Sequence, residues 1–485
     1  MLAPLLKDAY KAFHHRAYNP LVTHVYSNFT NRFNKHSNVK GNKAVVFFGL
    51  QRMIIKVLIR NWNKSFFQED KAEVVAEYNR VISAMLGKPI DTKHIEDLWD
   101  LGYLPIEIKA LPEGSLVPYG VPPFTITNTV SGFGWVVNML ETVISAEMWG
   151  ISTSATTAYY YRKRFEESSL PKDMIKFMGH DFSYRGMFGT EAAAMSGLGH
   201  LTSFVGSDVI PAALEAEEYY DAKIDKELVF SSVDATEHSV MCSYEQAGEL
   251  ESLKHLITKV TPTGIISIVS DTWDFWKLVT EYLPALKDVI LGRDGTVVIR
   301  PDSGDPVKIL CGDPESPIAH ENKGLIECLW DIFSGTVDAS GLKVLHKNIG
   351  AIYGDSITLE RQDEIITRLE AKGFLPLVVL GIGSYTYQYV TRDTHGSAVK
   401  ATDVQMGEGN HVAISKDPKT DSSKKSAKGL LMVVKEADGT YGLLDDVDPM
   451  LEGSELNRLE PVFKDGVLLK RTTLNEVRKL IDSTF

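Results

Sequence analysis

Short apolar runs rich in β-branched residues recur through the middle of the chain, and this rhythm restricts the fold more than any other feature. Five runs share the pattern: Leu228–Val233, Ile265–Val269, Val297–Ile299, Ile349–Tyr353 and Leu377–Leu380. They are apolar at odd and even positions alike, which is typical of strands buried on both faces of a sheet. Because helical patterns lie between them, the sequence predicts βαβ units and a parallel sheet.

Helices are predicted both within and before this rhythm. A long one is expected from about 134 to 162, after a stretch rich in Pro and Gly, 111–127, that predicts turns framing short strands. Apolar residues between 357 and 369 fall on one face of another helix, which Gly373 is placed to end. The residues from 273 to 288 have a similar helical pattern.

Composition restricts the class of protein. The 485 residues are 44% apolar and 24% charged, which suits two or three domains, or one large α/β barrel with additions. A net charge of −13 argues against a nucleic-acid partner, although local clusters still set local fields. The three cysteines are widely spaced, so neither a disulfide framework nor a metal-ligand pair is predicted.

The apolar stretch from Gly132 to Trp149 is interrupted by Glu141 and Glu147, which predicts a buried helix and no membrane span. The first residues lack a basic start, a long apolar run and a small-residue cleavage site. The sequence therefore predicts no signal peptide and a cytoplasmic location.

Polar and glycine residues follow each of the five apolar runs. These segments are Thr236–Ser239, Asp271–Thr272, Arg300–Gly304, Gly354–Ser356 and Gly381–Ser384. In an α/β barrel the active site forms at the carboxyl ends of the strands, so one shared pocket is predicted. Each segment taken alone is equally well explained as an ordinary turn, but the series favours a site.

Several of these residues have side chains of the kind that bind a phosphorylated sugar or react with a phosphoryl group. Arg300 offers a planar set of donors for a carbonyl or phosphate, and Asp302 suits ribose hydroxyls or hydrated Mg²⁺. His238 is either structural or a nucleophile toward a phosphoryl group. The glycines from Gly381, with Arg392 nearby, suit a phosphate. A cluster of lysines forms either a solvated loop or a phosphate clamp: Lys416, Lys419, Lys424, Lys425 and Lys428.

Seven motifs in one order make the chain similar to a known family. They are His180–Gly186, Phe204–Asp208, Thr236–Ser239, Ile268–Thr272, Ile299–Gly304, Gly354–Asp355 and Val390–Asp393. Their residues and spacing resemble those of the nicotinate/nicotinamide phosphoribosyltransferase family, and most closely its nicotinamide-specific bacterial and phage members. The resemblance extends from Asp8–Lys11 to Asn475–Lys479.

The resemblance implies a set of residues around the base. Phe182 would stack on one face of nicotinamide, and Tyr10 of a second subunit would stack on the other. Asp208 would accept a hydrogen bond from the carboxamide NH₂. Arg185 and Arg300 would line the base pocket.

The resemblance implies roles for the remaining residues as well. Asp302 and Gly354 would contact the ribose, while Asp271 and Asp355 would lie near the sugar or a metal. The other implied substrate contacts are Ser267 in the pocket, and Gly383, Ser384, Arg392 and Lys400 around phosphate. Basic residues around pyrophosphate and nucleotide would be Arg32, Lys416 and Lys424. His238 matches the histidine that ATP phosphorylates in this family. The metal ligands are not identified.

The implied fold is an irregular α/β barrel of the type II phosphoribosyltransferase kind with an additional α+β domain. The barrel would span 166–399, and the α+β domain 1–165 together with 400–485. The implied reaction converts nicotinamide and phosphoribosyl pyrophosphate to nicotinamide mononucleotide and pyrophosphate. Mg²⁺ would serve as cofactor and ATP as co-substrate, in a homodimer with shared active sites and no nucleic-acid or membrane partner.

Two alternatives remain open from the sequence. One is a nicotinate phosphoribosyltransferase, which Asp208 disfavours because a carboxylate repels the carboxylate of nicotinate. The other is a non-catalytic signalling protein on the same scaffold. The chain also departs from vertebrate-type members, which have a longer glycine run where Ser384 and Tyr385 stand here, and in the segment between Pro306 and Lys347.

Overall fold

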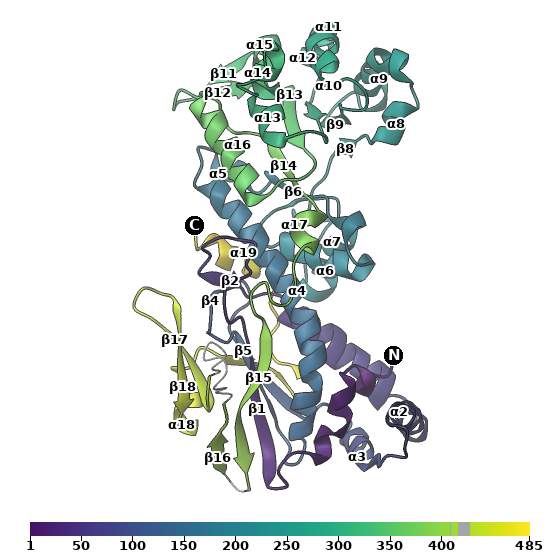
Figure 1. The fold of residues 1–485 in the computed structure, drawn as a ribbon, viewed down its shortest axis with the longest axis vertical. Helices are drawn as coiled ribbons and strands as arrows, with labels where there is room; N and C mark the ends of the chain where they lie inside the picture. Colours follow the sequence, from purple (N-terminus) through teal and green to yellow (C-terminus); the bar gives the residue numbers. More distant parts are fainter. Residues whose placement is uncertain (408, 416–426) are drawn as a thin grey trace. The chain divides into compact units, whose positions relative to one another are not determined.

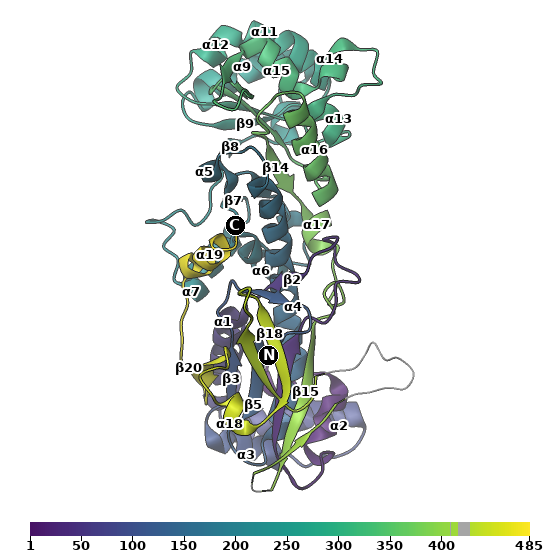
Figure 2. The same ribbon diagram turned by 90° about the vertical axis from the view of Figure 1, so that its left-hand side faces the viewer.

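The structure is a computed structural model that describes residues 1–407, 409–415 and 427–485. Two compact units are present, and both can be followed in Figures 1 and 2. Unit 1 comprises Met1–Thr156, Ala216–Ala222 and Val390–Thr484. Unit 2 comprises Thr157–Glu215 and Lys223–Tyr389, together with Phe485.

Unit 1 is built on an antiparallel sheet of seven strands in the order β16-β15-β1-β5-β3-β19-β20. The strands are β16 (Asn410–Ala413), β15 (Ala398–Met406), β1 (Val22–Thr30), β5 (Phe124–Asn128), β3 (Ile106–Ala110), β19 (Glu460–Lys464) and β20 (Val467–Leu468). Side chains alternate along each strand, so Ile106 and Ile108 of β3 are buried while Glu107 and Lys109 are half-buried. The apolar face packs on the long helix α4 (Gly134–Glu166) through residues such as Val136.

The other elements of unit 1 surround this sheet. The helices are η1 (Ala3–Leu5), η2 (Ala9–Arg16), α1 (Leu50–Met53), η3 (Ile54–Asn61), η4 (Asn63–Phe67), α2 (Lys71–Leu86), α3 (Lys93–Leu101), α18 (Pro449–Glu452) and α19 (Leu474–Asp482). Two small antiparallel pairs are β2 (Ala44–Val46) with β4 (Leu116–Pro118) and β17 (Leu430–Lys435) with β18 (Tyr441–Val447). Short strands with turns between them are therefore present in 111–127, as the Pro and Gly content predicts.

Unit 2 is built on a parallel sheet of seven strands in the order β7-β6-β14-β13-β10-β9-β8. The strands are β7 (Gly206–Ser207), β6 (Gly179–Asp181), β14 (Val379–Ile382), β13 (Ile349–Tyr353), β10 (Val297–Arg300), β9 (Ile266–Val269) and β8 (Asp234–Ala235). Four of the five predicted apolar runs supply β9, β10, β13 and β14. The prediction of a parallel sheet from alternating strands and helices is therefore confirmed.

The fifth run, Leu228–Val233, does not form the predicted strand. Instead Ser231 makes a single parallel bridge to Gly206 of β7, and the run continues into β8 at the other edge of the sheet. Leu228 and Val233 are exposed, so burial on both faces is lacking here. The segment closes the curled sheet into an irregular barrel, because it joins the two edge strands.

Helices cover the sheet of unit 2. They are α5 (Lys172–Ile175), η5 (Tyr184–Gly186), α6 (Thr190–His200), α7 (Ile210–Tyr220), α8 (His238–Cys242), η6 (Gln246–Gly248), α9 (Glu249–His255), η7 (Leu256–Val260), α10 (Phe275–Lys277), η8 (Leu278–Tyr282), α11 (Leu283–Ala285), α12 (Lys287–Leu291), α13 (Pro306–Cys311), α14 (Ala319–Lys323), α15 (Leu325–Phe333), α16 (Leu359–Ala371) and α17 (Ser384–Gln388). The last residues of α7 group with unit 1. Gly373 follows α16 with a φ of 76°, a left-handed conformation that ends the helix as predicted. The stretch predicted as helical at 273–288 is helical in successive short segments.

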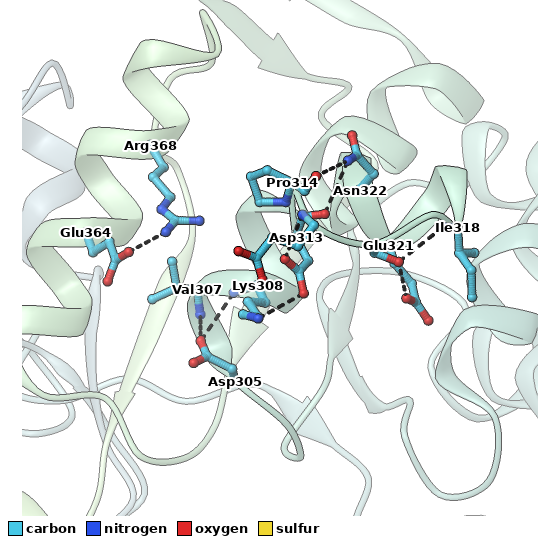
Figure 3. A network of polar contacts seen from close by, with 12 residues as sticks. Asp305, Val307, Lys308, Asp313, Pro314, Ile318, Glu321, Asn322, Glu364 and Arg368 are labelled. Atoms are coloured by element: carbon cyan, nitrogen blue, oxygen red, sulfur yellow. Dashed lines mark hydrogen bonds and ion pairs between the residues drawn. The ribbon is translucent and has the colours of Figure 1, made fainter.

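A network of polar contacts organises the segment after β10 (Figure 3). Asp305 caps α13 by accepting from the backbone N–H groups of Val307 and Lys308. The Lys308 ammonium then donates to Asp313 at 2.9 Å. Asn322 of α14 donates to the carbonyl of Asp313 at 3.2 Å. The segment is therefore an ordered part of unit 2, which also contains the hairpin β11 (Gly335–Val337) and β12 (Lys343–Leu345).

The prediction of a buried amphipathic helix around Glu141 and Glu147 is confirmed by α4. Both acids form ion pairs, Glu141 with Lys11 at 2.8 Å and Glu147 with Arg52 at 2.7 Å. In the part of the chain that the structure describes, no helix combines the length and the apolarity that crossing a bilayer requires.

Candidate active site

The carboxyl ends of the parallel strands meet at one edge of the sheet in unit 2 and bring predicted residues together. Arg300 ends β10, and Asp302 follows it. The Arg300 Nε lies 3.4 Å from Asp302 Oδ2, and the Asp302 N–H donates to Asp271 Oδ2 at 3.2 Å. The Arg300 guanidinium also donates to the carbonyl of Thr236 at 2.5 Å. Residues after three neighbouring strands therefore form one cluster.

Gly354, after β13, borders this cluster because it has no side chain. A Cβ at this position would overlap Oδ1 of Asp302, so only glycine permits the approach. That Oδ1 is buried and accepts no hydrogen bond from the residues that the structure describes. Burial raises the pKa of Asp302 and Asp271 adds to the effect, while Arg300 opposes it. A buried acceptor of this kind suits a hydroxyl group or a hydrated cation.

Asp208, after β7, is held by two side chains that the sequence did not identify. His180 Nε2 lies 2.9 Å from Asp208 Oδ1, and the Ser232 hydroxyl donates to the same oxygen at 2.6 Å. Among the described residues no group donates to Oδ2. The carboxylate is therefore fixed through one oxygen and open for an incoming donor at the other.

The charge of Asp208 is stabilised despite partial burial. Burial by itself would raise the pKa of this carboxyl, but the hydrogen bonds from His180 and Ser232, with the charge of Arg300, outweigh it. The pKa of Asp208 consequently lies below its ordinary value. The site therefore presents an ionised acceptor at neutral pH.

Phe182 lies beside this acceptor. Its ring centroid is 4.5 Å from that of His180 at an angle of 34°, and its backbone N–H donates to the Ile382 carbonyl at 3.0 Å. A Cβ on Gly381 would stand 2.7 Å from the Phe182 ring, so the glycine allows β14 to approach it. The aromatic face and the Asp208 carboxylate thus lie on neighbouring strands.

His238 begins α8 at the same edge of the sheet. Its Nε2 lies 3.2 Å from Oδ1 of Asp271, while Asp271 Oδ2 accepts from Asp302. Asp271 is almost fully buried, whereas about half of the His238 side chain is exposed. A buried carboxylate therefore orients an accessible imidazole.

The predicted phosphate segment also lies in unit 2. Gly383 precedes α17 and has open space where a Cβ would be, and Ser384 packs against Gly186 of η5 so closely that a side chain there would collide with it. Arg185 of η5 is exposed. Asp355 accepts from the Ser356 hydroxyl at 2.9 Å, in a turn where Ser356 has a φ of 58°.

Ser267 of β9 also belongs to this unit. Its hydroxyl is buried and makes no hydrogen bond among the described residues. Like Asp302 Oδ1, it is a polar group that a ligand would satisfy.

A second group of predicted residues lies in unit 1, where Tyr10, Arg392 and Lys400 line one cavity of about 260 Å³. Tyr10 of η2 is 60% exposed, and the side chains of Arg392 and Lys400 are 55% and 45% exposed. Arg32 donates to the Gly396 carbonyl at 2.7 Å. Burial and then the charge of Arg392 lower the pKa of Arg32, which places the two cations in one neighbourhood.

Two predicted basic residues, Lys416 and Lys424, lie outside the described residues. Lys428 is described and forms an ion pair with Asp446 at 2.8 Å. For Lys428 the contact supports the interpretation of a solvated loop residue.

Asp302 and Asp271 are compatible with a bound Mg²⁺ ion, but their arrangement does not define where the ion would lie. No cluster of three potential ligands is present among the residues that the structure describes. Mg²⁺ is usually held by one or two carboxylates together with water and substrate phosphates, so a three-residue cluster is not required. The unsatisfied Oδ1 of Asp302 and the adjacent Asp271 fit that arrangement.

These features define a class: an α/β barrel with an acid, an aromatic ring, an arginine and a histidine at the carboxyl ends of its strands. Comparison with known proteins gives the family. Residues 177–466 match the model of the nicotinate phosphoribosyltransferase (NAPRTase) family. The chain belongs to this family.

Full-length relatives support the assignment. A protein of Acinetobacter baylyi named nicotinamide phosphoribosyltransferase is 48% identical over 490 residues, covering 97% of this chain and 95% of the relative. One of the same name from Xanthomonas campestris is 30% identical and covers 98% of this chain and 97% of the relative.

Solved structures confirm the predicted fold. The nicotinate-nucleotide pyrophosphorylase of Pyrococcus furiosus has a TM-score of 0.58 at 14% identity, over 99% of this chain and 95% of that one. The human nicotinic acid phosphoribosyltransferase has a TM-score of 0.56 at 15% identity, over 99% and 93%. The fold is an irregular α/β barrel of the type II phosphoribosyltransferase kind with an additional α+β unit.

Proposed function

We propose that this chain is a nicotinamide phosphoribosyltransferase of NAD salvage. It joins the ring nitrogen of nicotinamide to C1 of the sugar of phosphoribosyl pyrophosphate, forms nicotinamide mononucleotide and releases pyrophosphate. The observation that carries the choice of base is the ionised Asp208, held by His180 and Ser232 beside Phe182. The full-length relatives named for the same activity support it.

The geometry of Asp208 favours an amide over a carboxylate. Its second oxygen accepts from the carboxamide NH₂ of nicotinamide, while Phe182 supplies a flat surface for the ring. Nicotinate would place its own carboxylate near an acceptor whose pKa is already lowered. Like charges at close range repel, so the site discriminates by charge and by hydrogen bonding.

The cluster of Arg300, Asp302 and Gly354 suits the sugar. Transfer develops positive charge on the ribosyl ring and negative charge on the departing pyrophosphate, so fixed groups of opposite sign stabilise the transition state. Asp302 accepts from ribose hydroxyls beside Gly354. We propose that Arg300 contacts the carboxamide oxygen, and that Gly383, Ser384, Arg392 and Lys400 contact phosphate.

Mg²⁺ is proposed as cofactor, with Asp302 and Asp271 as the residues that would hold it through water. When bound, it would neutralise charge on the pyrophosphate. Asp355, whose charge acts on Asp302, is proposed to lie near the same ion.

ATP is proposed as co-substrate that phosphorylates His238. Asp271 faces Nε2 of His238 and favours the tautomer with the proton on that nitrogen, so Nδ1 keeps the nucleophilic lone pair. Attack of Nδ1 on the γ-phosphorus forms the N–P bond and breaks the bond to ADP, which leaves. The added negative charge on His238, beside Asp271, would strengthen the attraction for a hydrated cation and its pyrophosphate.

A homodimer is proposed because the predicted site residues are divided between the two units of the chain. Tyr10 stands exposed on η2, and any subunit that supplies it to a neighbour also supplies Arg392 and Lys400, which line the same cavity. In unit 2 three aromatic side chains are exposed near the phosphate segment: Phe188, Tyr385 and Tyr389. A second chain of the same kind would cover such a surface. The cytoplasmic location and the absence of nucleic-acid and membrane partners remain predictions from the sequence.

A turnover assay tests the proposal. Purified protein is supplied with phosphoribosyl pyrophosphate, Mg²⁺ and either nicotinamide or nicotinate, and the mononucleotide is measured with and without ATP. We expect the nicotinamide product and a large preference over nicotinate. A preference for nicotinate would overturn the choice of base, and the absence of product from both would favour the non-catalytic alternative.

A further inference from the structure

Glu141 stands in the apolar helix α4, and each of its carboxylate oxygens faces a different lysine of unit 1. Lys11 Nζ lies 2.8 Å from Oε2, and Lys400 Nζ lies 3.5 Å from Oε1. Lys11 belongs to η2, next to Tyr10, and Lys400 belongs to β15. One carboxylate therefore links the segment that carries Tyr10 to the strand that carries Lys400.

The two lysines are held very differently. The Lys11 side chain is 2% exposed, and its ammonium also donates to the Asn138 carbonyl at 2.9 Å. Lys400 is exposed, and its distance of 3.5 Å from Glu141 is that of a loose ion pair. A buried ammonium requires its counter-ion, whereas an exposed one exchanges partners readily. Glu141 is thus fixed by Lys11 and only loosely engaged by Lys400.

Glu141 lines the same cavity as Tyr10, Arg392 and Lys400. The other acid of that lining, Asp8, is engaged by Thr142, whose hydroxyl donates to it at 2.7 Å. That hydrogen bond leaves the charge of Asp8 in place, so both carboxylates add negative charge to the cavity, and Glu141 is the one that pairs with Lys400. A phosphate group that enters must compete with it.

We infer that Glu141 is a positioning residue that serves as an internal counter-ion, which Lys400 exchanges for a phosphate group of pyrophosphate. This inference rests on the proposed function, in which Arg392 and Lys400 bind phosphate. In the free protein Glu141 holds Lys400 at the cavity. When pyrophosphate binds, Lys400 turns to the ligand and Glu141 stays on Lys11. The competition weakens pyrophosphate binding and thereby favours product release.

The test is Glu141→Gln, in which the side chain keeps an acceptor for Lys11 and loses the charge. Since an exposed ion pair contributes about 0.2–1 kcal/mol, the variant should bind pyrophosphate roughly 1.4- to fivefold more tightly. The gain should shrink as salt rises, because exposed charges are screened. Titration calorimetry with pyrophosphate and Mg²⁺, at low and high ionic strength, measures both effects.

Glu147→Gln is the matched control. Glu147 lies on the same helix and pairs with Arg52, but it does not line the cavity. Its variant should bind pyrophosphate like the unchanged protein. If loss of charge next to Lys11 prevents folding of Glu141→Gln, the double variant Lys11→Met with Glu141→Gln removes the buried cation as well, and the same tightening is expected.

Lys400→Gln separates this inference from the proposed function. If Lys400→Gln leaves pyrophosphate binding unchanged, Lys400 does not bind pyrophosphate, and the exchange with Glu141 is wrong as well. If Lys400→Gln weakens binding but Glu141→Gln binds no more tightly than the unchanged protein, the counter-ion role is wrong. If both roles are right, Glu141→Gln should gain less in the Lys400→Gln background than in the unchanged protein.

Discussion

The strand ends of unit 2 and the cavity of unit 1 carry the same kinds of residue but hold them in opposite ways. In unit 2, Asp208, Arg300 and Asp271 are engaged by close protein partners before any ligand arrives. In unit 1, Tyr10, Arg392 and Lys400 are largely exposed and loosely held. The first set is held in place by neighbouring protein groups, and the second set is not.

The difference fits the division of chemical work. Groups that stabilise developing charge act best when they are already oriented, because they need not reorganise during the reaction. Groups that capture and release phosphates gain from mobility, because the product must leave. We therefore expect Asp302 of unit 2 to act mainly through kcat, and the cations of unit 1 to act mainly through phosphate binding.

The largest effect is expected for Asp302→Asn. The substitution keeps the size of the side chain and removes the charge from the position proposed to face the sugar, so kcat should fall by about a hundred- to a thousandfold. Steady-state kinetics with nicotinamide and phosphoribosyl pyrophosphate measure it. Asp305→Asn is the control, because Asp305 caps α13 outside the cluster and asparagine also caps helices. Equal rates for the two variants would contradict the assignment of Asp302.

The sequence predicts those parts of the site that depend on residues close together in the chain. The strands that contain Ile266, Val297 and Ile349 follow from local apolar runs, and polar residues after them meet because parallel strands end at one edge. The resemblance to the family then assigned Asp208 and Phe182, whose roles remain proposals.

Other features depend on contacts between distant residues. His180 and Ser232 lie 28 and 24 residues from Asp208 in sequence, and no local pattern indicates that they hold it. The Leu228–Val233 run looked like a strand, but its position at the closing seam of the barrel leaves its ends exposed. Glu141 interrupted an apolar helix in the sequence, and only the structure shows which lysines it faces.

The next largest effect is expected for Asp208→Asn, on the preference for nicotinamide over nicotinate. Asp208→Asn keeps the shape and removes the charge, and a charged hydrogen bond contributes about 1.5–3 kcal/mol. The ratio of kcat/KM for nicotinamide to that for nicotinate should therefore fall about ten- to a hundredfold. Ser232→Ala, which removes one donor to the same carboxylate, should shift the ratio less. An unchanged ratio in Asp208→Asn would remove Asp208 from base selection.

His238→Ala should separate ATP hydrolysis from synthesis. The variant should keep slow synthesis without ATP and lose the stimulation, which we expect to be about tenfold, a usual size for coupling between two ligands. ADP and nicotinamide mononucleotide are measured in the same reaction, together with acid-labile phosphoprotein. If ADP still forms in step with product, His238 is not the phosphorylated residue.

The dimer is tested by complementation between the two units. Tyr10→Ala protein is mixed with Asp302→Ala protein, each nearly inactive alone, and subunits are allowed to exchange. If each site takes Tyr10 from one chain and Asp302 from the other, half of the sites in mixed dimers are intact. About half of the dimers are mixed, so activity should recover to at most roughly a quarter. No recovery despite demonstrated exchange would mean that Tyr10 does not act across subunits.

The two units also contain contrasting buried glutamates. Glu113 of unit 1 accepts from the N–H groups of Gly49 and Gln51, both at 2.6 Å, and from the Tyr220 hydroxyl at 2.8 Å. Glu249 of unit 2, at the start of α9, has a buried Oε1 with no donor among the described residues. The carboxylate of Glu113 therefore has its hydrogen-bond donors within the protein. Glu249 has a buried oxygen to which no described residue donates, so its charged form destabilises the folded state.

The smallest expected effect is that of Glu249→Gln on stability. Burial raises the pKa of Glu249 from 4.5 to about 7. The charge of Asp274 adds to this shift, and the charge of Lys277 opposes it. A carboxyl whose pKa is higher in the folded state favours folding only while it is protonated there. Stability is therefore lost as pH rises from about 4.5 to about 7, and the loss stays constant above that range. The neutral glutamine avoids it, so Tm should exceed that of the unchanged protein at pH 8 but not at pH 4.5, by about 2–4 °C for each kcal/mol relieved. Calorimetry at both pH values measures the difference, with the exposed Glu251→Gln on the same helix as control. A Tm difference that does not change with pH would show that Glu249 carries no such penalty, and that its burial differs from that of Glu113 only in geometry.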